Sequence, residues 1–185
     1  MKNLGGDDAV KNIARAFEDP SALLKHECAY CLGQMQNETA IPILMNILDN
    51  LNEDPMVRHE AGEALGAIGK YNENVLEILK KYSNDKYEVV SETCQIALKL
   101  LEWHKSKDTL KENLSENPYY SVDPAPPSDF KLLKVEDLKV KLLDENENLF
   151  ERYRAMFALR NIGTDESILA LCEGNSLSLS KIQFI

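Results

Sequence analysis

The sequence repeats itself, and this repeat limits the possible folds more than any other feature. Residues 26–33 (HECAYCLG) resemble residues 59–66 (HEAGEALG), which lie 33 positions later. A further step of 33 reaches residues 92–98, and a fourth copy, residues 153–159, follows a long insertion. The four copies share a leucine column made of Leu32, Leu65, Leu98 and Leu159. Each copy has apolar residues three or four positions apart, which predicts a helix.

Further helices are predicted between and after these copies. The apolar spacing favours helices over residues 40–48, 75–82, 135–143, 149–162 and 166–171. Asp54 and Pro55 supply an N-terminal cap before the second copy, and Gly69 supplies a stop after it. Helix pairs that recur about every 30–45 residues are typical of stacked solenoids. The sequence therefore predicts an all-α fold, an α-solenoid of helical hairpin repeats.

A proline-rich stretch interrupts the repeats. Pro118, Pro124, Pro126 and Pro127 lie so close together that this stretch cannot be helical. We therefore predict a first repeat block over residues 1–104, a linker over 105–130, and the start of a second block over 131–174. Residues 175–185 fit no repeat and are predicted to be a tail.

Charge and composition exclude some classes of function. The 21 basic and 31 acidic residues give a formal net charge of −10, which argues against nucleic-acid binding and suits a basic partner. No apolar run approaches the roughly 18 residues of a membrane span. The first residues show no apolar stretch of the signal-peptide type, so we expect no membrane association and a cytoplasmic location. Four cysteines are too few for a disulfide scaffold, in keeping with a reducing compartment.

Cys28 and Cys31 form a CxxC motif that could indicate zinc or redox chemistry. However, Cys28 aligns with Ala61 and Cys31 aligns with Ala64, so both occupy columns of small residues. Such columns are typical of positions where one helix packs closely on the next. We therefore favour a packing role for both cysteines.

Two of the three histidines occupy the same repeat position, and a glutamate follows each. Equivalent positions on successive repeats lie side by side, so His26 and His59 could share a divalent metal ion. Two histidines and one carboxylate form the open triad of non-haem iron oxygenases. The alternative is that His26-Glu27 and His59-Glu60 are solvated or salt-bridged surface pairs.

The spacing leaves open which carboxylate would bind. Residues four apart share a helix face, which favours Glu63 over Glu60 as a partner of His59. Glu60 can still reach an ion that lies in the groove between two helices. The HExxH motif of zinc proteases is absent, because Tyr30 and Glu63 occupy the positions of its second histidine.

Four segments together resemble deoxyhypusine hydroxylase. They are residues 24–35, residues 55–69, residues 120–127 (YSVDPAPP) and residues 150–160 (FERYRAMFALR). The resemblance covers about residues 3–174. It implies a HEAT-repeat protein with a di-iron centre that uses dioxygen to hydroxylate deoxyhypusine, a modified lysine on a translation initiation factor, to hypusine.

The resemblance also implies roles for individual residues. His26, His59 and Glu60 would bind iron (Fe²⁺), and Glu27 would face the cationic substrate as a catalytic carboxylate. The family has two more His-Glu motifs downstream, so we expect a truncated form, the N-terminal half plus the first repeat of the second half. Such a monooxygenase chain would hold half of the di-iron site, bind at most one ion and be inactive alone. We expect it to be a monomer. The alternative function is a non-catalytic helical-repeat scaffold that binds a basic protein.

Overall fold

The predicted helices form in the computed structural model of the chain, which describes residues 5–106, 114–129 and 134–177. The chain divides into two units, Met1–Asp108 with Val122–Pro124, and Thr109–Ser121 with Ala125–Ile185. Unit 1 contains the helices α1 (Gly6–Ala14), α2 (Ala22–Met35), α3 (Ile41–Asp49), α4 (Pro55–Ile68), α5 (Glu73–Tyr82) and α6 (Glu88–Ser106), with short 3₁₀ turns at Arg15–Glu18 and Glu38–Ala40. Unit 2 contains α7 (Val135–Leu143), α8 (Leu149–Ile162) and α9 (Asp165–Leu177).

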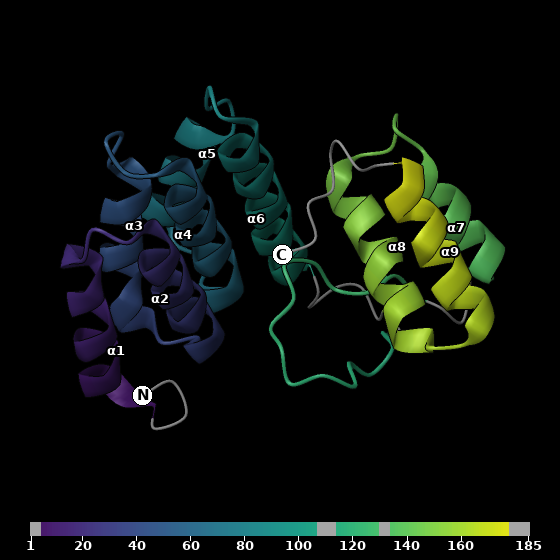
Figure 1. Ribbon diagram of the computed structural model, residues 1–185, viewed down its shortest axis with the longest axis horizontal. Helices are drawn as coiled ribbons and strands as arrows, with labels where there is room; N and C mark the ends of the chain where they lie inside the picture. Colours follow the sequence, from purple (N-terminus) through teal and green to yellow (C-terminus); the bar gives the residue numbers. More distant parts are fainter. Residues whose placement is uncertain (1–4, 107–113, 130–133, 178–185) are drawn as a thin grey trace. The chain divides into compact units, whose positions relative to one another are not determined.

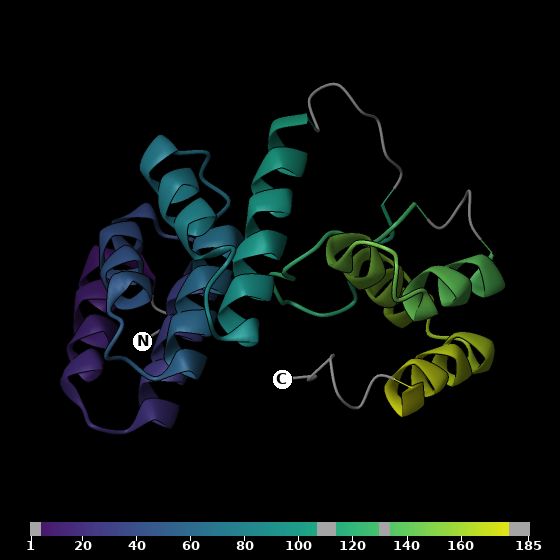
Figure 2. The ribbon, with the colours of Figure 1, turned by 90° about the horizontal axis from the view of Figure 1, so that it is seen from above.

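The helices of unit 1 stack in two layers (Figure 1). In the inner layer, α2 packs against α4 and α4 packs against α6. In the outer layer, α3 covers α4, α5 covers α6, and α3 also contacts α5 (Figure 2). The repeat leucines Leu32 and Leu65 are fully buried between these layers. This arrangement confirms the predicted all-α solenoid, and the described residues contain no strand.

Local sequence explains where the inner helices begin and end. The Asp54 side chain accepts a hydrogen bond from the Met56 amide at the start of α4, where Pro55 occupies the first helical position. Gly69 ends the helix with a φ of 69°, a left-handed conformation that glycine adopts at low cost. Both features were predicted from the sequence. They fix the register of the helix that carries His59.

Two glycines allow the inner helices to approach each other closely. A Cβ atom at Gly33 of α2 would lie 2.8 Å from the Cα of Ala64 on α4. One repeat later, a Cβ at Gly66 would lie 2.9 Å from the Cβ of Ala97 on α6. Real Cβ atoms do not come this close, so each contact requires glycine. Close helix spacing is what allows side chains of neighbouring repeats to reach a common point.

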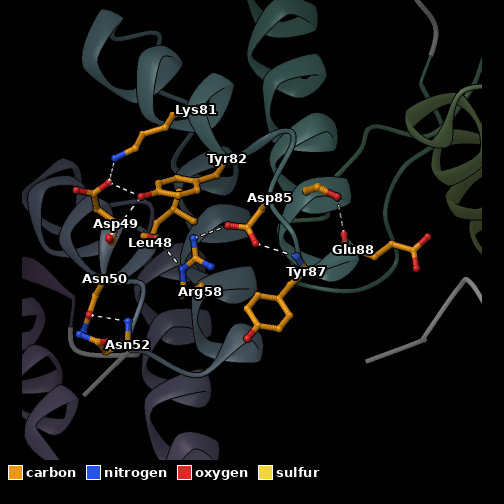
Figure 3. A network of polar contacts seen from close by, with 11 residues as sticks. Leu48, Asp49, Asn50, Asn52, Arg58, Lys81, Tyr82, Asp85, Tyr87 and Glu88 are labelled. Atoms are coloured by element: carbon orange, nitrogen blue, oxygen red, sulfur yellow. Dashed lines mark hydrogen bonds and ion pairs between the residues drawn. The ribbon is translucent and has the colours of Figure 1, made fainter.

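A buried arginine ties the second repeat to the third (Figure 3). Arg58 is 1% exposed; its Nε donates to the Leu48 carbonyl at the end of α3, and its terminal nitrogen donates to Asp85 at 2.8 Å. Its guanidinium also stacks 4.8 Å from the Tyr82 ring centre. In unit 2, Arg152 makes the same type of bond to the Leu142 carbonyl. Arg58 therefore anchors α4 immediately before His59.

Residues 114–129, which hold the four closely spaced prolines, contain no helix, as the prolines predict, whereas residues 105 and 106 of the predicted linker form the end of α6. Val122–Pro124 belongs to unit 1, whereas the carbonyls of Pro126 and Pro127 accept hydrogen bonds from Arg154 in unit 2. Helix α9 continues to Leu177, three residues into the segment predicted as a tail. The rest of that segment, residues 178–185, lies outside the described residues.

No helix in the described part of the chain has the length and apolar character needed to cross a membrane. All four cysteines are free. Cys94, which shares the column of Cys28, is fully buried, and Cys28 and Cys31 pack against the core. This placement agrees with the packing role that the repeat columns predict.

Candidate metal centre

The inner helices bring the two predicted His-Glu motifs together. His26 comes from α2, and His59 and Glu60 come from the neighbouring helix α4. The Nε2 atom of His26 lies 3.2 Å from a carboxylate oxygen of Glu60. Two adjacent ligands of one ion, each about 2.1 Å from it, would be about 3 Å apart. The contact between His26 and Glu60 is that of an ion pair, and its length is also compatible with two ligands on one metal.

A second group of potential ligands overlaps the first at Glu60. One ligand atom each from His59, Glu60 and Glu63 lies within 4.8 Å of the others. Opposed ligands of one ion would be about 4.2 Å apart, so small side-chain movements would close this group around a metal. Both carboxylates that the sequence left as alternatives lie in the cluster. Glu60 is the carboxylate that lies near both His26 and His59.

Two residues of α6 hold the ring of His59 through its Nδ1 atom. Its Nδ1 lies 3.2 Å from the carbonyl oxygen of Val89, and the Thr93 hydroxyl is also hydrogen-bonded to Nδ1. Its Nε2 is buried without a hydrogen-bond partner. A histidine that binds a metal through one nitrogen usually donates its other N–H to a carbonyl or carboxylate. The side chains present at this position therefore fit a metal ligand set.

Burial and mutual repulsion shape the charges of the cluster. Burial, with Glu63 and Glu27 nearby, raises the pKa of Glu60 to about 8. Burial and the charge of Asp123 raise the pKa of Glu63 to about 7. Burial lowers the pKa of His59. The hydrogen bond to Val89 acts in the opposite direction, and the nearby His26 lowers the pKa further. A divalent cation would relieve the repulsion between the carboxylates and would find a neutral imidazole.

Glu27 lies at the edge of this cluster, away from its buried part. Its side chain is 58% exposed, and one of its oxygens lies 3.5 Å from Nδ1 of His26. That His26 nitrogen makes no hydrogen bond. The exposure of Glu27 suits a carboxylate that meets a ligand from solvent better than it suits a buried metal ligand.

The structure adds residues that the sequence did not predict for this site. Val89 and Thr93 orient His59, but they belong to a repeat without a His-Glu motif, so no motif pointed to them. Asp123 comes from the proline-rich stretch and acts on Glu63 through its charge. His104, which aligns with no other histidine, packs its ring edge-on against Trp103 and is not part of the cluster.

Comparisons with known proteins agree with the fold and with the sequence resemblance. Residues 8–99 match the HEAT repeats family, and residues 151–174 match the PBS lyase HEAT-like repeat. Deoxyhypusine hydroxylase of Danio rerio is 60% identical over 175 residues, and that of Homo sapiens is 55% identical over 177 residues, each covering 94% of this chain. A solved structure of human deoxyhypusine hydroxylase in complex with glycerol superposes with a TM-score of 0.85 over 95% of this chain and 58% of that one. The chain spans 55–56% of the length of these two curated relatives.

Proposed function

We propose that this chain, a HEAT-repeat protein similar to deoxyhypusine hydroxylases over 94% of its length, supplies iron ligands for the hydroxylation of deoxyhypusine to hypusine. The observation that carries this proposal is the meeting of His26 Nε2 and Glu60 at 3.2 Å, beside the unpartnered Nε2 of His59. Nothing in the part of the chain that the structure describes favours the alternative of a non-catalytic scaffold.

Each residue of the cluster has a distinct role in this proposal. His26, His59 and Glu60 would hold the metal, and iron bound there would supply the redox chemistry that dioxygen requires. The Val89 carbonyl would fix the His59 ring so that Nε2 faces the cluster. Glu63 would be a further ligand or would accept a proton beside the metal. Glu27 would pair with the cationic amine of the substrate from the exposed side.

The substrate and the cellular location follow from the same proposal. The substrate would be a deoxyhypusine residue on a translation initiation factor, and the net charge of −10 favours such a cationic ligand. The four free cysteines are compatible with a reducing compartment, which supports a cytoplasmic location.

Metal binding tests the ligand set directly. We expect the purified chain to bind one Fe²⁺ per molecule under anaerobic conditions, because the described residues gather one cluster. His26→Ala, His59→Ala and Glu60→Gln should each weaken binding, by about tenfold or more for the loss of a ligand. His104→Ala is the matched control, a histidine of the same unit outside the cluster, and should bind iron normally. Equal affinity in all four variants would contradict the assignment.

Activity requires a separate experiment, since the chain spans 55–56% of the length of the two curated relatives. A chimera in which this chain replaces the aligned part of the zebrafish hydroxylase should hydroxylate a deoxyhypusine-containing peptide. The same chimera with His59→Ala should lose the activity while the His104→Ala version keeps it. A folded, iron-loaded chimera without activity would rule out the proposed reaction for this chain.

A further inference from the structure

His26 and His59 are each met by a residue of the next repeat, and the two contacts are equivalent by position. Glu60 lies 34 residues after His26, and Thr93 lies 34 residues after His59. The first contact joins His26 Nε2 to a Glu60 oxygen at 3.2 Å, and the second joins His59 Nδ1 to the Thr93 hydroxyl. Thr93 thus occupies, in the third repeat, the position that a glutamate holds in the first two.

The two contacts differ in the ring nitrogen that they use. His26 meets Glu60 through Nε2, whereas His59 meets Thr93 through Nδ1. The Nε2 atom of His59 is therefore left without a hydrogen-bond partner, although it is buried. The same repeat position supplies a carboxylate to the cluster from α4, and it supplies a neutral hydroxyl to the opposite side of a histidine ring from α6.

Packing holds the Thr93 side chain in the position from which it reaches His59. Thr93 is only 6% exposed. A Cβ atom at Gly62 of α4, one helical turn after His59, would lie 3.3 Å from the Cγ2 methyl group of Thr93. This methyl group therefore packs against α4 where a glycine leaves room for it. Because the methyl and hydroxyl groups share one Cβ atom, fixing the methyl group also fixes the direction of the hydroxyl.

The two oxygens beside Nδ1 favour one tautomer of the neutral His59 ring. The Val89 carbonyl oxygen, 3.2 Å from Nδ1, can only accept a hydrogen bond. A hydrogen on Nδ1 satisfies this carbonyl and the lone pairs of the Thr93 hydroxyl, whereas a lone pair on Nδ1 would face the carbonyl oxygen. With the hydrogen on Nδ1, the ring has its free lone pair on Nε2. A metal ion can bind that lone pair without displacing a proton.

We propose that Thr93 is a positioning residue for His59: its buried hydroxyl, together with the Val89 carbonyl, keeps the ring hydrogen on Nδ1 and leaves Nε2 free to bind the metal. This inference rests on the proposed function for the role of His59 as a metal ligand. The tautomer of His59 in the metal-free chain does not depend on it.

The first test reads the tautomer in the metal-free chain by ¹⁵N NMR of labelled histidine side chains, with His59→Ala to assign the His59 signals. The original chain should show His59 with its hydrogen on Nδ1. Thr93→Val keeps the packed methyl group and removes the hydroxyl, so His59 should shift toward a mixture of both tautomers. Thr93→Ser keeps the hydroxyl and should retain the Nδ1–H form.

The second test measures the affinity for Fe²⁺ under anaerobic conditions. Thr93→Val should bind about tenfold or more weakly than the original chain and Thr93→Ser within about threefold of it, because an outer partner of a metal-binding histidine contributes at this level. Thr93→Ala and Thr93→Ser differ only by the hydroxyl, so the gap between these two gives the answer if Thr93→Val folds poorly. Ser91→Ala is the matched control: it removes another hydroxyl of α6, which donates to the Glu88 carbonyl, and should change neither measurement.

The two measurements separate this inference from the proposed function. A His59 ring with its hydrogen on Nε2 in the original chain, or an unchanged tautomer in Thr93→Val, would overturn the inference whatever the chain binds. Equal iron affinity with and without the hydroxyl would also overturn it, while the ligand assignment would stand. A tautomer that depends on Thr93 in a chain that binds no iron would support the hold on His59 and count against the proposed function.

Discussion

Arg58 and His59 are neighbours in the sequence but have different roles: Arg58 stabilises the fold, and His59 belongs to the candidate metal centre. The guanidinium of Arg58 is buried and bonded to Leu48 and Asp85, so it holds α4 in place. The imidazole of His59 lies in one group of potential metal ligands with Glu60 and Glu63, and it relies on that placement. Because adjacent residues on a helix point about 100° apart, one short segment of α4 can support the fold on one side and the site on the other.

Loss of the arginine should therefore be costly. Arg58→Met leaves the Asp85 carboxylate buried without its cation, so we expect the free energy of unfolding to fall by about 3 kcal/mol. Urea denaturation followed by fluorescence of Trp103, the chain's single tryptophan and part of α6, measures this change in unit 1.

The control for this variant is an ion pair of the same repeat at the surface. Lys81 pairs with Asp49, and both side chains are more than half exposed. Lys81→Met should cost less than about 1 kcal/mol, since exposed pairs are screened by water. Similar losses in the two variants would show that the burial of Arg58 does not determine how much it contributes to the free energy of unfolding.

At the scale of helices, spacing decides whether the two histidines can share an ion. His26 and His59 lie on different helices, and the gap between these helices is limited at Gly33 and Ala64. The repeat itself was readable from the sequence because the same small residues recur every 33 positions. Helix α8 begins and ends at the predicted residues, Leu149 and Ile162, since Asn148 caps one end and Gly163 ends the other.

Gly33→Ala tests this dependence of the site on helix spacing. The new Cβ would lie within 2.9 Å of two Ala64 atoms, one of them backbone, so α2 and α4 must move apart. We expect a loss of about 1–3 kcal/mol in stability from overpacking and a weaker affinity for Fe²⁺.

Gly62→Ala provides the comparison for that experiment. Its Cβ would meet side-chain atoms of Thr93 and Cys94 at 3.3–3.4 Å, which leaves room for a small adjustment. Its effects on stability and iron affinity should be smaller than those of Gly33→Ala. An equal loss of iron affinity would argue against the α2–α4 distance as the controlling quantity.

For the whole molecule, the sequence predicted what depends on local pattern and missed what depends on distant contacts. The solenoid and the approach of the two His-Glu motifs, seen in the contact of His26 with Glu60, follow from the repeat. The hydrogen bond between Gln34 and Val122 does not, because these residues are 88 positions apart and neither belongs to a repeated motif. The choice between Glu60 and Glu63 also required the structure, which places both carboxylates near His59.

The buried carboxylates should make the stability of the metal-free chain depend on pH. Folding raises the pKa of Glu60 from 4.5 to about 8 and that of Glu63 from 4.5 to about 7. Between pH 4.5 and 8 these two carboxyl groups thus bind more protons in the folded state than in the unfolded state. The contribution of these groups to stability is present below pH 4.5 and is lost as the pH rises toward 8.

Denaturation in the presence of a chelator, followed by Trp103 fluorescence, should show this loss between pH 5 and pH 8, on the order of 5 kcal/mol. Glu60→Gln should flatten most of the dependence, because the amide cannot ionise. Glu77→Gln, at an exposed position of α5, should leave it unchanged. A Glu60→Gln profile parallel to that of the original chain would contradict the placement of this carboxylate in a desolvated site.

The close contact at Gly33 has a consequence for how variation in this protein is read. Gly33 has no side chain and contributes no ligand atom, yet the absence of its side chain limits the span that the ligands must bridge. A library designed by holding only the metal-contacting positions constant would leave this residue free to vary. Many of its members would keep every ligand and still lose the site.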